Sequence, residues 1–156
     1  MRLLLLAAGT RLPAWVNAGY EEYAGRLTGD YRLELKEIAL GQRSGGGDTK
    51  QAIAKEGERM LAALPASPYL VALQVTGRSL TSEQLAKFLE ARANDGRDVA
   101  FCIGGPEGLA PVVDARADFR WSLSALTLPH ALARVVIAEA LYRAVTIVKG
   151  HPYHRA

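Results

Sequence analysis

Short apolar runs alternate with amphipathic stretches along this sequence, and this alternation limits the fold more than any other feature. We predict strands over residues 2–8, 32–39, 69–75, 98–103 and 120–124. Strands that alternate with helices are typical of a mostly parallel sheet with helices on its faces. A chain of 156 residues can bury one such core. The sequence therefore predicts one α/β domain over residues 1–156, built as a three-layer sandwich.

Four segments between and after these strands have apolar residues at helical spacing. We expect helices that follow Pro13, that begin near Asp48 and at Thr81 or Ser82, and that run from about Pro129 to Val148. Gln84 stands three residues after Thr81, the spacing of a capping box. The last helix places Glu139 in a stripe of apolar residues, four positions before Arg143, with which it can pair. The run Gly45–Gly47 predicts a mobile loop.

Charge and cysteine content narrow the class of protein. The 19 Lys and Arg residues against 16 Asp and Glu give a net charge of +3, which permits a polyanionic partner without demanding one. Cys102 is the single cysteine, so no internal disulfide can form and we expect a cytoplasmic protein. Its place in an apolar run indicates packing, not nucleophilic catalysis. No apolar stretch approaches the roughly 18 residues that a membrane span needs.

A glycine-rich turn follows the apolar run 99–103. It reads Gly104-Gly105-Pro106-Glu107-Gly108-Leu109. Ligands of open α/β sheets collect beyond the carboxyl ends of the strands, where glycine lets a ligand approach the backbone. The turn is thus either a pocket wall or ordinary loop punctuation, and the glycines alone leave both open. The phosphate-binding patterns GxxxxGK[ST] and GxGxxG are absent, which disfavours ATP and NAD.

The segment Trp121–His130 mixes leucines with small hydroxyl residues. Such a stretch can offer main-chain amides and carbonyls to an adenine edge while leucines cover its faces. An ordinary connection from strand to helix is the alternative. At the end of this segment, His130 and Arg134 share one helical face, which suits either a site or surface ion pairing.

The chain ends His151-Pro152-Tyr153-His154-Arg155, and no acidic residue follows Glu139. A basic tail with an aromatic ring can stack on a base and contact phosphate, whereas a frayed terminus is the plain alternative. His151 and His154 have no nearby Cys, Asp or Glu, so we predict no metal site. No GxSxG elbow supports a serine hydrolase.

Five stretches of the sequence together match one family, in the same order and over the full length of the chain. They are residues 8–10, 103–109, 123–130, 139–144 and 151–155. In them the chain resembles the SPOUT-class methyltransferases that modify N3 of a pseudouridine in large-subunit ribosomal RNA, the RlmH family. The resemblance implies a deep C-terminal trefoil knot, which default topology rules exclude. It also implies a homodimer packed through the knotted region, in which the tail of one subunit closes over the cofactor of the other.

The resemblance further implies S-adenosylmethionine as cofactor and no metal. The cofactor-binding residues that it indicates are Leu73, Gly104, Gly105, Leu123, Ser124, Ala125, Leu126, Thr127 and Leu128. Methyl transfer to a ring nitrogen must also dispose of one proton. We hypothesise that His130 assists proton removal or orients the base. In the same hypothesis Arg134, His154 and Arg155 stabilise negative charge on carbonyls and phosphates.

The net charge of +3 is small for gripping RNA over a large footprint. We therefore expect the substrate to be a folded RNA surface, as in an assembled ribosome. Two other functions stay open at this point. One is a non-catalytic ribosome- or RNA-binding module with the same fold, and the other is a SPOUT methyltransferase that acts on tRNA.

Overall fold

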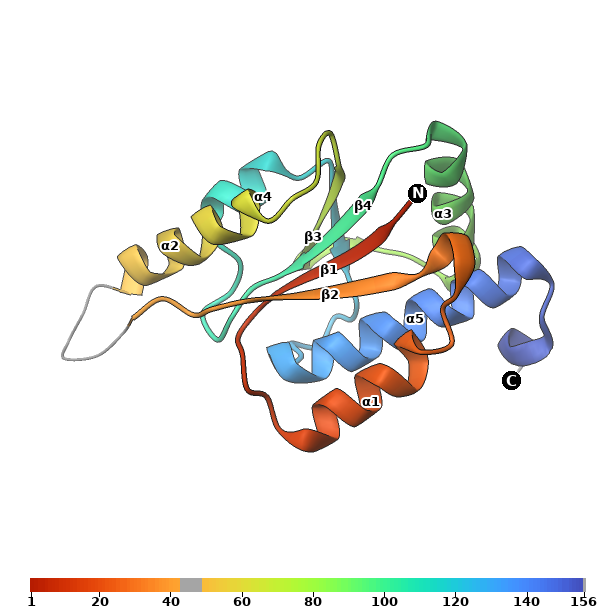
Figure 1. Cartoon of the computed structure of the whole chain (residues 1–156), viewed down its shortest axis with the longest axis horizontal. Helices are drawn as coiled ribbons and strands as arrows, with labels where there is room; N and C mark the ends of the chain where they lie inside the picture. Colours follow the sequence, from red (N-terminus) through yellow and green to blue (C-terminus); the bar gives the residue numbers. More distant parts are fainter. Residues whose placement is uncertain (43–48, 156) are drawn as a thin grey trace.

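A parallel sheet of five strands forms the centre of the protein (Figure 1). The computed structural model describes residues 1–42 and 49–155, with only the backbone of Arg155. The strands are β1 (Leu3–Ala8), β2 (Leu33–Ile38), β3 (Tyr69–Ser79), β4 (Val99–Ile103) and β5 (Phe119–Ser122). Their order across the sheet is β2-β1-β4-β3-β5, and every neighbouring pair is parallel. The predicted strands and α/β class are confirmed.

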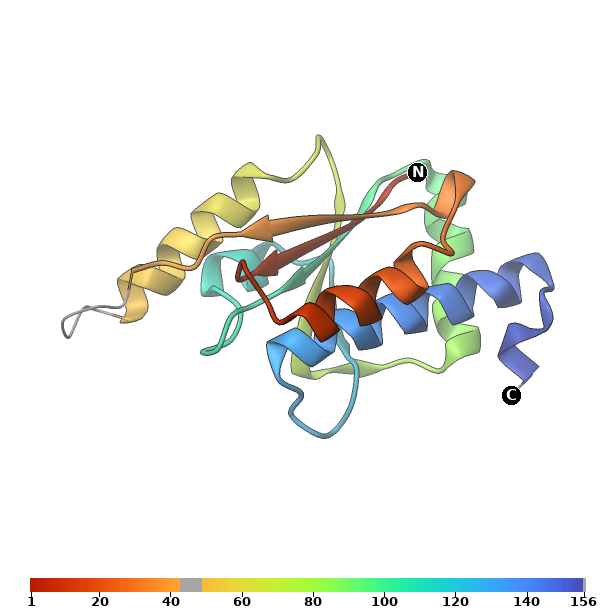
Figure 2. The same ribbon diagram turned by 60° about the horizontal axis from the view of Figure 1, so that its bottom comes forward.

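Helices cover both faces of this sheet, as the two views show (Figures 1 and 2). One layer holds α1 (Ala14–Ala24), α3 (Ser82–Asp95) and α5 (His130–Lys149), and the other holds α2 (Thr49–Ala62) and α4 (Pro111–Arg116). Two short 3-10 turns are η1 (Gly29–Tyr31) and η3 (Pro152–Arg155). The four predicted helices are confirmed, whereas α4 was not predicted, because six residues carry too little periodicity.

Helix α3 begins where its capping pattern predicts. The Gln84 amide donates to Thr81 Oγ1 at 3.0 Å, and the Thr81 amide donates to Gln84 Oε1 at 2.8 Å. This reciprocal pair satisfies two of the free amides of the first turn. The predicted cap at Asp48 and the predicted loop Gly45–Gly47 lie outside the described residues.

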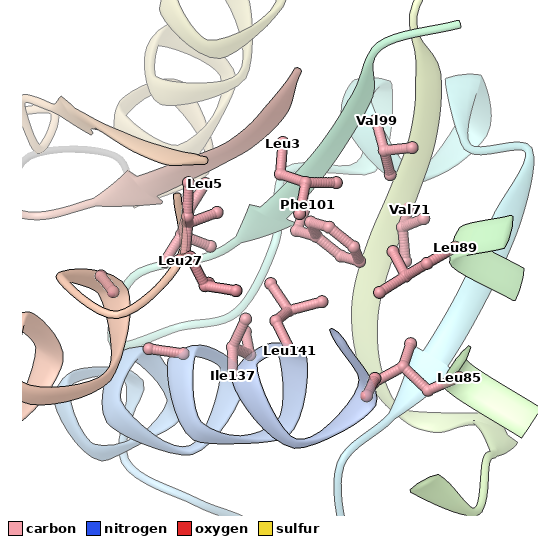
Figure 3. Packing of buried hydrophobic residues seen from close by; sticks show 14 of the residues in the cluster. Leu3, Leu5, Leu27, Val71, Leu85, Leu89, Val99, Phe101, Ile137 and Leu141 are labelled. Atoms are coloured by element: carbon pink, nitrogen blue, oxygen red, sulfur yellow. The ribbon is translucent and has the colours of Figure 1, made fainter. Parts of the chain in front are cut away.

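The four leucines of β1 divide the core between the two faces of the sheet. Leu3 and Leu5 point toward α3 and α5, where they join Phe101, Ile137 and Leu141 in one cluster (Figure 3). Leu4 and Leu6 join Met60 of α2 and Val113 of α4 on the other face. A strand buried on both faces reads as a continuous apolar run because it has no solvent side.

Cys102 lies in the second cluster and is fully buried. Burial raises the pKa of its thiol to about 12, so the reactive thiolate is suppressed at neutral pH. The packing role that we predicted for Cys102 agrees with this position.

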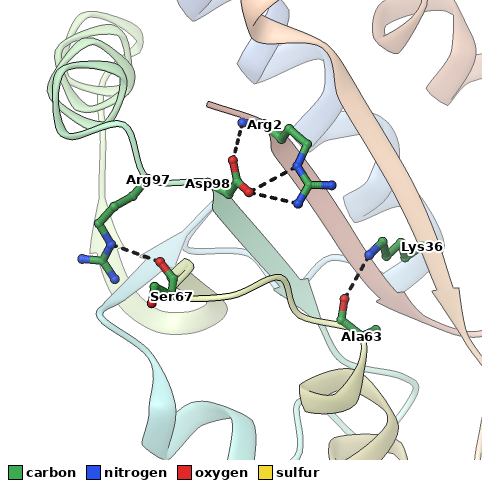
Figure 4. A network of polar contacts seen from close by, with 6 residues as sticks. All are labelled: Arg2, Lys36, Ala63, Ser67, Arg97 and Asp98. Atoms are coloured by element: carbon green, nitrogen blue, oxygen red, sulfur yellow. Dashed lines mark hydrogen bonds and ion pairs between the residues drawn. The ribbon is translucent and has the colours of Figure 1, made fainter.

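Polar contacts tie the amino ends of the strands together (Figure 4). Asp98 accepts two hydrogen bonds from the Arg2 guanidinium, at 3.2 and 3.1 Å, and a third from the Arg2 amide at 2.8 Å. These bonds hold the pKa of Asp98 below its usual value, against the opposing effect of burial. Just before β4, Arg97 Nε donates to the Ser67 carbonyl at 3.4 Å, whereas Lys36 Nζ, from the middle of β2, donates to the Ala63 carbonyl after α2 at 3.0 Å. This end of the sheet is occupied by structural contacts, which leaves the carboxyl ends for a site.

Helix α5 buries a face of mainly small and aliphatic residues, among them Ile137, Ala138 and Leu141. The stripe noted in the sequence, Leu132, Val135, Val136, Glu139 and Tyr142, lies beside this face and is only half-buried. Val135 of that stripe packs on Gly19 of α1, where an added Cβ would come within 3.3 Å of it. Thus α5 packs closely on α1 and keeps a half-buried apolar stripe next to the core face.

Candidate active site

A pocket of about 420 Å³ lies where β4 and β5 end, next to the first turn of α5. It is lined by Leu73, Gln74 and Val75 of β3, by Ile103–Pro106, Gly108 and Leu109 after β4, by Trp121, Leu123, Ser124 and Leu126–Pro129 after β5, and by His130 and Ala133 of α5. This is the edge at which open α/β sheets bind ligands, and the volume falls in the usual range for small-molecule sites. Among the described lining residues, His130 is the only one with a titratable side chain.

An irregular stretch of β3 forms one wall of this pocket. Leu73 and Arg78 both pair with Trp121 of β5, so residues 74–77 bulge out of the ladder. Gly77 is required there, because a Cβ would meet the Arg120 backbone at 2.8 Å. Gln74 Nε2 donates to Asp114 Oδ1 at 3.2 Å, which fastens the bulge to α4.

The bulge is further anchored through Asp114, which also accepts from Arg120 Nε at 2.9 Å. The hydrogen bond from Arg120 is the main reason that the pKa of Asp114 is lowered. We expected a strand over 69–75, with Leu73 as its one cofactor-binding residue. The pocket residues Gln74 and Val75 were therefore missed. A β-bulge has no distinctive sequence signal beyond Gly77.

The glycine-rich turn serves both purposes that the sequence left open. A Cβ on Gly104 would meet Gly108 backbone atoms at 2.2 Å, and the Gly108 amide donates to the Gly105 carbonyl at 3.0 Å. Glycine is therefore needed for the turn itself. The same turn lines the pocket through Gly104, Gly105 and Gly108, so it is also the predicted pocket wall.

The loop after β5 leaves main-chain groups for a ligand. Ser122 Oγ donates to the Ser124 carbonyl at 2.9 Å, and the Leu126 amide donates to Ser124 Oγ at 3.0 Å. No backbone–backbone hydrogen bond involves residues 123–128 within the described chain. Ala125, Leu126 and Thr127 are exposed, so main-chain groups of this loop are accessible to a ligand that covers it.

His130 opens α5 and is half-buried at the pocket. Burial, and secondly the nearby positive charge of Arg134, lower the pKa of its imidazole. The neutral imidazole is therefore favoured near neutral pH, and this form can accept a proton. The structure thus brings His130 to the predicted cofactor residues.

Arg134 lies one turn further along α5 and is only 1% exposed. Its Nη1 donates to Glu37 Oε2 and its Nη2 to the Gly9 carbonyl, both at 2.7 Å. It does not line the pocket. The contacts that the structure describes for Arg134 are to the protein, where we had predicted contacts to substrate oxygens.

The tail lies at the opposite end of α5 from the pocket (Figures 1 and 2). Tyr153 Oη donates to Glu139 Oε1 at 3.2 Å, and its ring lies 4.6 Å from that of Tyr142. His154 is half-buried, and its Nδ1 is buried without a hydrogen-bond partner among the described residues. The side chain of Arg155 lies outside the described residues. The tail residues are therefore not brought to the pocket of their own chain.

Eight of the nine predicted cofactor residues line the pocket, the exception being Ala125. Pocket residues that sequence reasoning missed are Gln74, Val75 and Ala133, whereas Trp121 opens the segment that we had singled out. Apolar side chains dominate the walls, and unpaired main-chain groups border them. This combination fits an adenosine-type cofactor, whose base presents two apolar faces and a hydrogen-bonding edge.

Two kinds of feature, metal-binding clusters and membrane-spanning helices, are absent from residues 1–42 and 49–155. No cluster of three or more His, Cys, Asp or Glu side chains is arranged to hold a metal ion. None of the helices there combines the length and apolarity that crossing a membrane requires.

Comparison with known proteins places this chain in a family. Residues 1–154 match the family model described as "Predicted SPOUT methyltransferase". Two proteins named ribosomal RNA large subunit methyltransferase H, from Stenotrophomonas maltophilia strains K279a and R551-3, are each 53% identical to it over 156 residues, which is 100% of both chains. The chain therefore belongs to the SPOUT methyltransferases and, within them, to the family of ribosomal RNA large subunit methyltransferase H.

Proposed function

We propose that this chain transfers a methyl group from S-adenosylmethionine to N3 of a pseudouridine in large-subunit ribosomal RNA. The observation that carries the proposal is a single pocket wall built from the family's motif segments, with a half-buried histidine of lowered pKa at its edge. The names of the two relatives supply the substrate class, ribosomal RNA of the large subunit.

The pocket residues bind and orient the cofactor in this proposal. Leu73, Leu123 and Leu128 pack against the adenine, and the main-chain groups of residues 125–128 bond its edge. When bound, the cofactor supplies an electrophilic methyl carbon on a sulfonium. Apolar walls exclude water, which would otherwise compete with the nucleobase for the reacting position.

His130 manages the proton. N3 of pseudouridine carries a hydrogen at neutral pH, so its lone pair becomes available only as that hydrogen leaves. The neutral imidazole would accept this proton, and a cofactor held by the pocket residues would supply the methyl group to N3. A lowered pKa keeps His130 in the accepting form, with burial as its first cause and Arg134 as its second.

A homodimer completes the site. Helix α5 has 20 residues and so spans about 30 Å, with the pocket at its first turn and the tail beyond its last. A tail so placed serves a pocket only on another chain, and an antiparallel partner α5 would bring it there. The half-buried stripe with Leu132 and Val136 offers apolar surface for such a partner. The partner's tail then supplies His154 and Arg155 to stabilise charge on the RNA.

The trefoil knot is part of this proposal. Segment 123–129 runs from β5, at one sheet edge, to α5 beneath the centre of the sheet, and it borders both the β3 bulge and the turn after β4. A knot requires one segment to thread through a loop formed by the others, and the family resemblance leads us to expect that threading at this segment.

The substrate form follows from charge. A net charge of +3 favours an ordered RNA surface in an assembled ribosome, in the cytoplasm, over free RNA. Methylation rates with purified ribosomes and with free ribosomal RNA test this directly. Equal rates on both substrates would remove the ribosome from the proposal.

The function itself is tested by mass mapping of ribosomal RNA from a strain that lacks the gene. We expect one pseudouridine to lose a methyl group and to regain it when the gene is restored. Restoring the His130→Ala variant should leave the base unmethylated. An unchanged map would contradict the proposal, and loss of a methyl group from a tRNA instead would redirect it to another substrate.

The role of His130 has a separate test. With ribosomes and saturating cofactor, His130→Ala should lower the single-turnover rate by about 100-fold or more, the usual contribution of a general base. The affinity for S-adenosylmethionine, measured by calorimetry, should change little, because the imidazole is only one of the many groups that line the pocket. A wild-type rate in this variant would exclude His130 as the base.

A further inference from the structure

We propose that Arg134 is a positioning residue of the active site: its buried guanidinium ties the first turn of α5 to the carboxyl ends of β1 and β2, and so fixes the His130 imidazole at the pocket. The inference rests on the proposed function, in which His130 takes the proton. It assigns Arg134 a place behind the reacting groups instead of in contact with RNA.

The contacts of the guanidinium carry the first step. Arg134 Nη1 bonds Glu37 near the end of β2, and Nη2 bonds the Gly9 carbonyl immediately after β1, each at 2.7 Å. The Gly9 amide in turn donates to the Ile38 carbonyl at 2.7 Å. One side chain of α5 is thus bonded to both strands at the point where they stop.

Gly9 links this clamp to His130. A Cβ on Gly9 would lie 3.6 Å from Arg134 Nη2 and 3.7 Å from His130 Nε2, so both side chains border the space beside this glycine. Its φ of +114° is a conformation that other residues rarely adopt. The imidazole therefore lies against a backbone segment whose position the arginine holds.

Burial explains why the clamp requires an arginine. At 1% exposure, the side chain has given up its hydration and depends on its two acceptors. A guanidinium can bond two acceptors in different directions at once, whereas a lysine ammonium is a point charge. Lysine at this position keeps the positive charge beside His130 and loses part of the geometry.

The charge of Arg134 also acts on His130. Burial is the main cause of the lowered imidazole pKa, and the positive charge of Arg134 is the second. Two other titratable groups lie on the surrounding elements. One is Tyr20 of α1, whose pKa is raised by burial so that its phenol stays protonated, and the other is Glu37, on the far side of the Arg134 guanidinium. The neighbouring loops carry Arg11 and Glu107.

Two substitutions change this charge in opposite directions. Arg134→Gln removes the positive neighbour, which favours the imidazolium, so the pKa of His130 should rise. Glu37→Gln keeps an oxygen acceptor for Nη1 but removes the compensating negative charge. The pKa of His130 should then fall slightly, since Glu37 is partly exposed and its charge is screened.

The experiment is an NMR titration of His130 in the full-length protein, with its signal assigned by His130→Gln. Arg134→Lys should stay close to the wild-type pKa, and Arg116→Gln, which removes an exposed charge on α4, is the matched control and should change nothing. The acid limb of the single-turnover pH profile should move with the pKa in each variant. A purely structural role would lower the rate at every pH and leave that limb in place.

Opposite shifts for Arg134→Gln and Glu37→Gln support the proposal. An unchanged His130 pKa in both variants overturns it, and if Arg134→Gln does not fold, Glu37→Gln and Arg134→Lys decide alone. The titration needs no turnover. Failure of His130 as the base would therefore appear as full activity of His130→Gln, separately from the outcome for Arg134.

Discussion

The two halves of α5 both carry an arginine paired with a glutamate, yet they are built in different ways. In the first half, Arg134 is 1% exposed and pairs with Glu37, 97 positions away in the sequence. In the second half, which leads to the tail, the side chain of Arg143 is 29% exposed and pairs with that of Glu139, which is 26% exposed and lies four positions earlier on the same helix. The first pair joins α5 to β2, and the second lies within α5.

The difference indicates what each half does. A buried arginine with acceptors on two strands has little freedom, which suits a site whose base must be held in place. The second half combines a half-buried ion pair with aromatic contacts: the Arg143 guanidinium lies 4.9 Å from the centre of the Tyr153 ring, and the tilted rings of Tyr142 and Tyr153 have their centres 4.6 Å apart. Such contacts are individually weak, which agrees with the proposal that the tail meets another subunit.

The largest expected effect on stability is in the first half of α5. Arg134→Met should lower the free energy of unfolding by about 3 kcal/mol, since it strands the Gly9 carbonyl and a carboxylate that is only partly exposed. The comparison variant is Arg143→Met, for which we expect about 1 kcal/mol or less. Both are measured by urea unfolding at one fixed protein concentration. Equal losses in the two variants would erase the contrast between the halves.

Removal of the tail should reverse the order of effects. A chain that ends at His151 should lose at least about 100-fold in methylation rate, equivalent to about 2.7 kcal/mol of activation free energy. Its stability should fall by only about 1 kcal/mol, because few buried groups are lost. Single-turnover assays and urea unfolding of the same sample give both numbers. Retained activity would show that the tail takes no part in the site.

A finer change at the tail should loosen it without removing it. Tyr153→Phe deletes the hydroxyl that donates to Glu139, a half-buried hydrogen bond worth about 1 kcal/mol. Amide exchange of residues 151–155 should therefore accelerate about three- to fivefold. Tyr69→Phe, at the start of β3, serves as the matched control. Unaltered exchange in Tyr153→Phe would mean that this bond does not hold the tail.

The smallest effect is the pH dependence contributed by His130. Its pKa is lowered in the folded protein, so below the ordinary value of about 6.5 the unfolded chain binds the proton first. Stability contributed by the neutral imidazole is therefore complete above that value and is lost as the pH falls toward the folded pKa. Unfolding measured at pH 7.5 and 5.5 should show a smaller acid loss in His130→Gln than in the wild type. An identical loss would indicate that His130 has its ordinary pKa in the fold.

Local patterns predicted much of this molecule. Period and length located the five strands, and the Thr81–Gln84 spacing located a helix start, because these signals depend on neighbours in the sequence. The Glu139–Arg143 pair also follows from helical spacing and is confirmed at 2.8 Å. The cofactor residues came from the family resemblance, and the pocket lining agrees with all of them except Ala125.

Nonlocal features could not be predicted in this way. The burial of Arg134 depends on Glu37 and Gly9, which lie 97 and 125 positions away and reach it only through the strand order. Spacing placed Arg134 on the face of His130, where surface pairing was one of the open interpretations. The bulge at Gln74 likewise depends on Asp114 and Arg120, so its place in the pocket wall had no signal within β3.

The most direct test of the account is a mixed dimer, because its central claim is that the two ends of α5 meet across subunits in one active site. One chain carries His130→Ala with an intact tail, and the other ends at His151 with His130 intact. A different affinity tag on each chain allows the mixed dimer to be purified in two steps, and native mass spectrometry confirms its composition. The account predicts that each parent dimer is inactive and that the mixed dimer recovers about half of the wild-type rate, since one of its two sites is complete. A mixed dimer as inactive as its parents would contradict it.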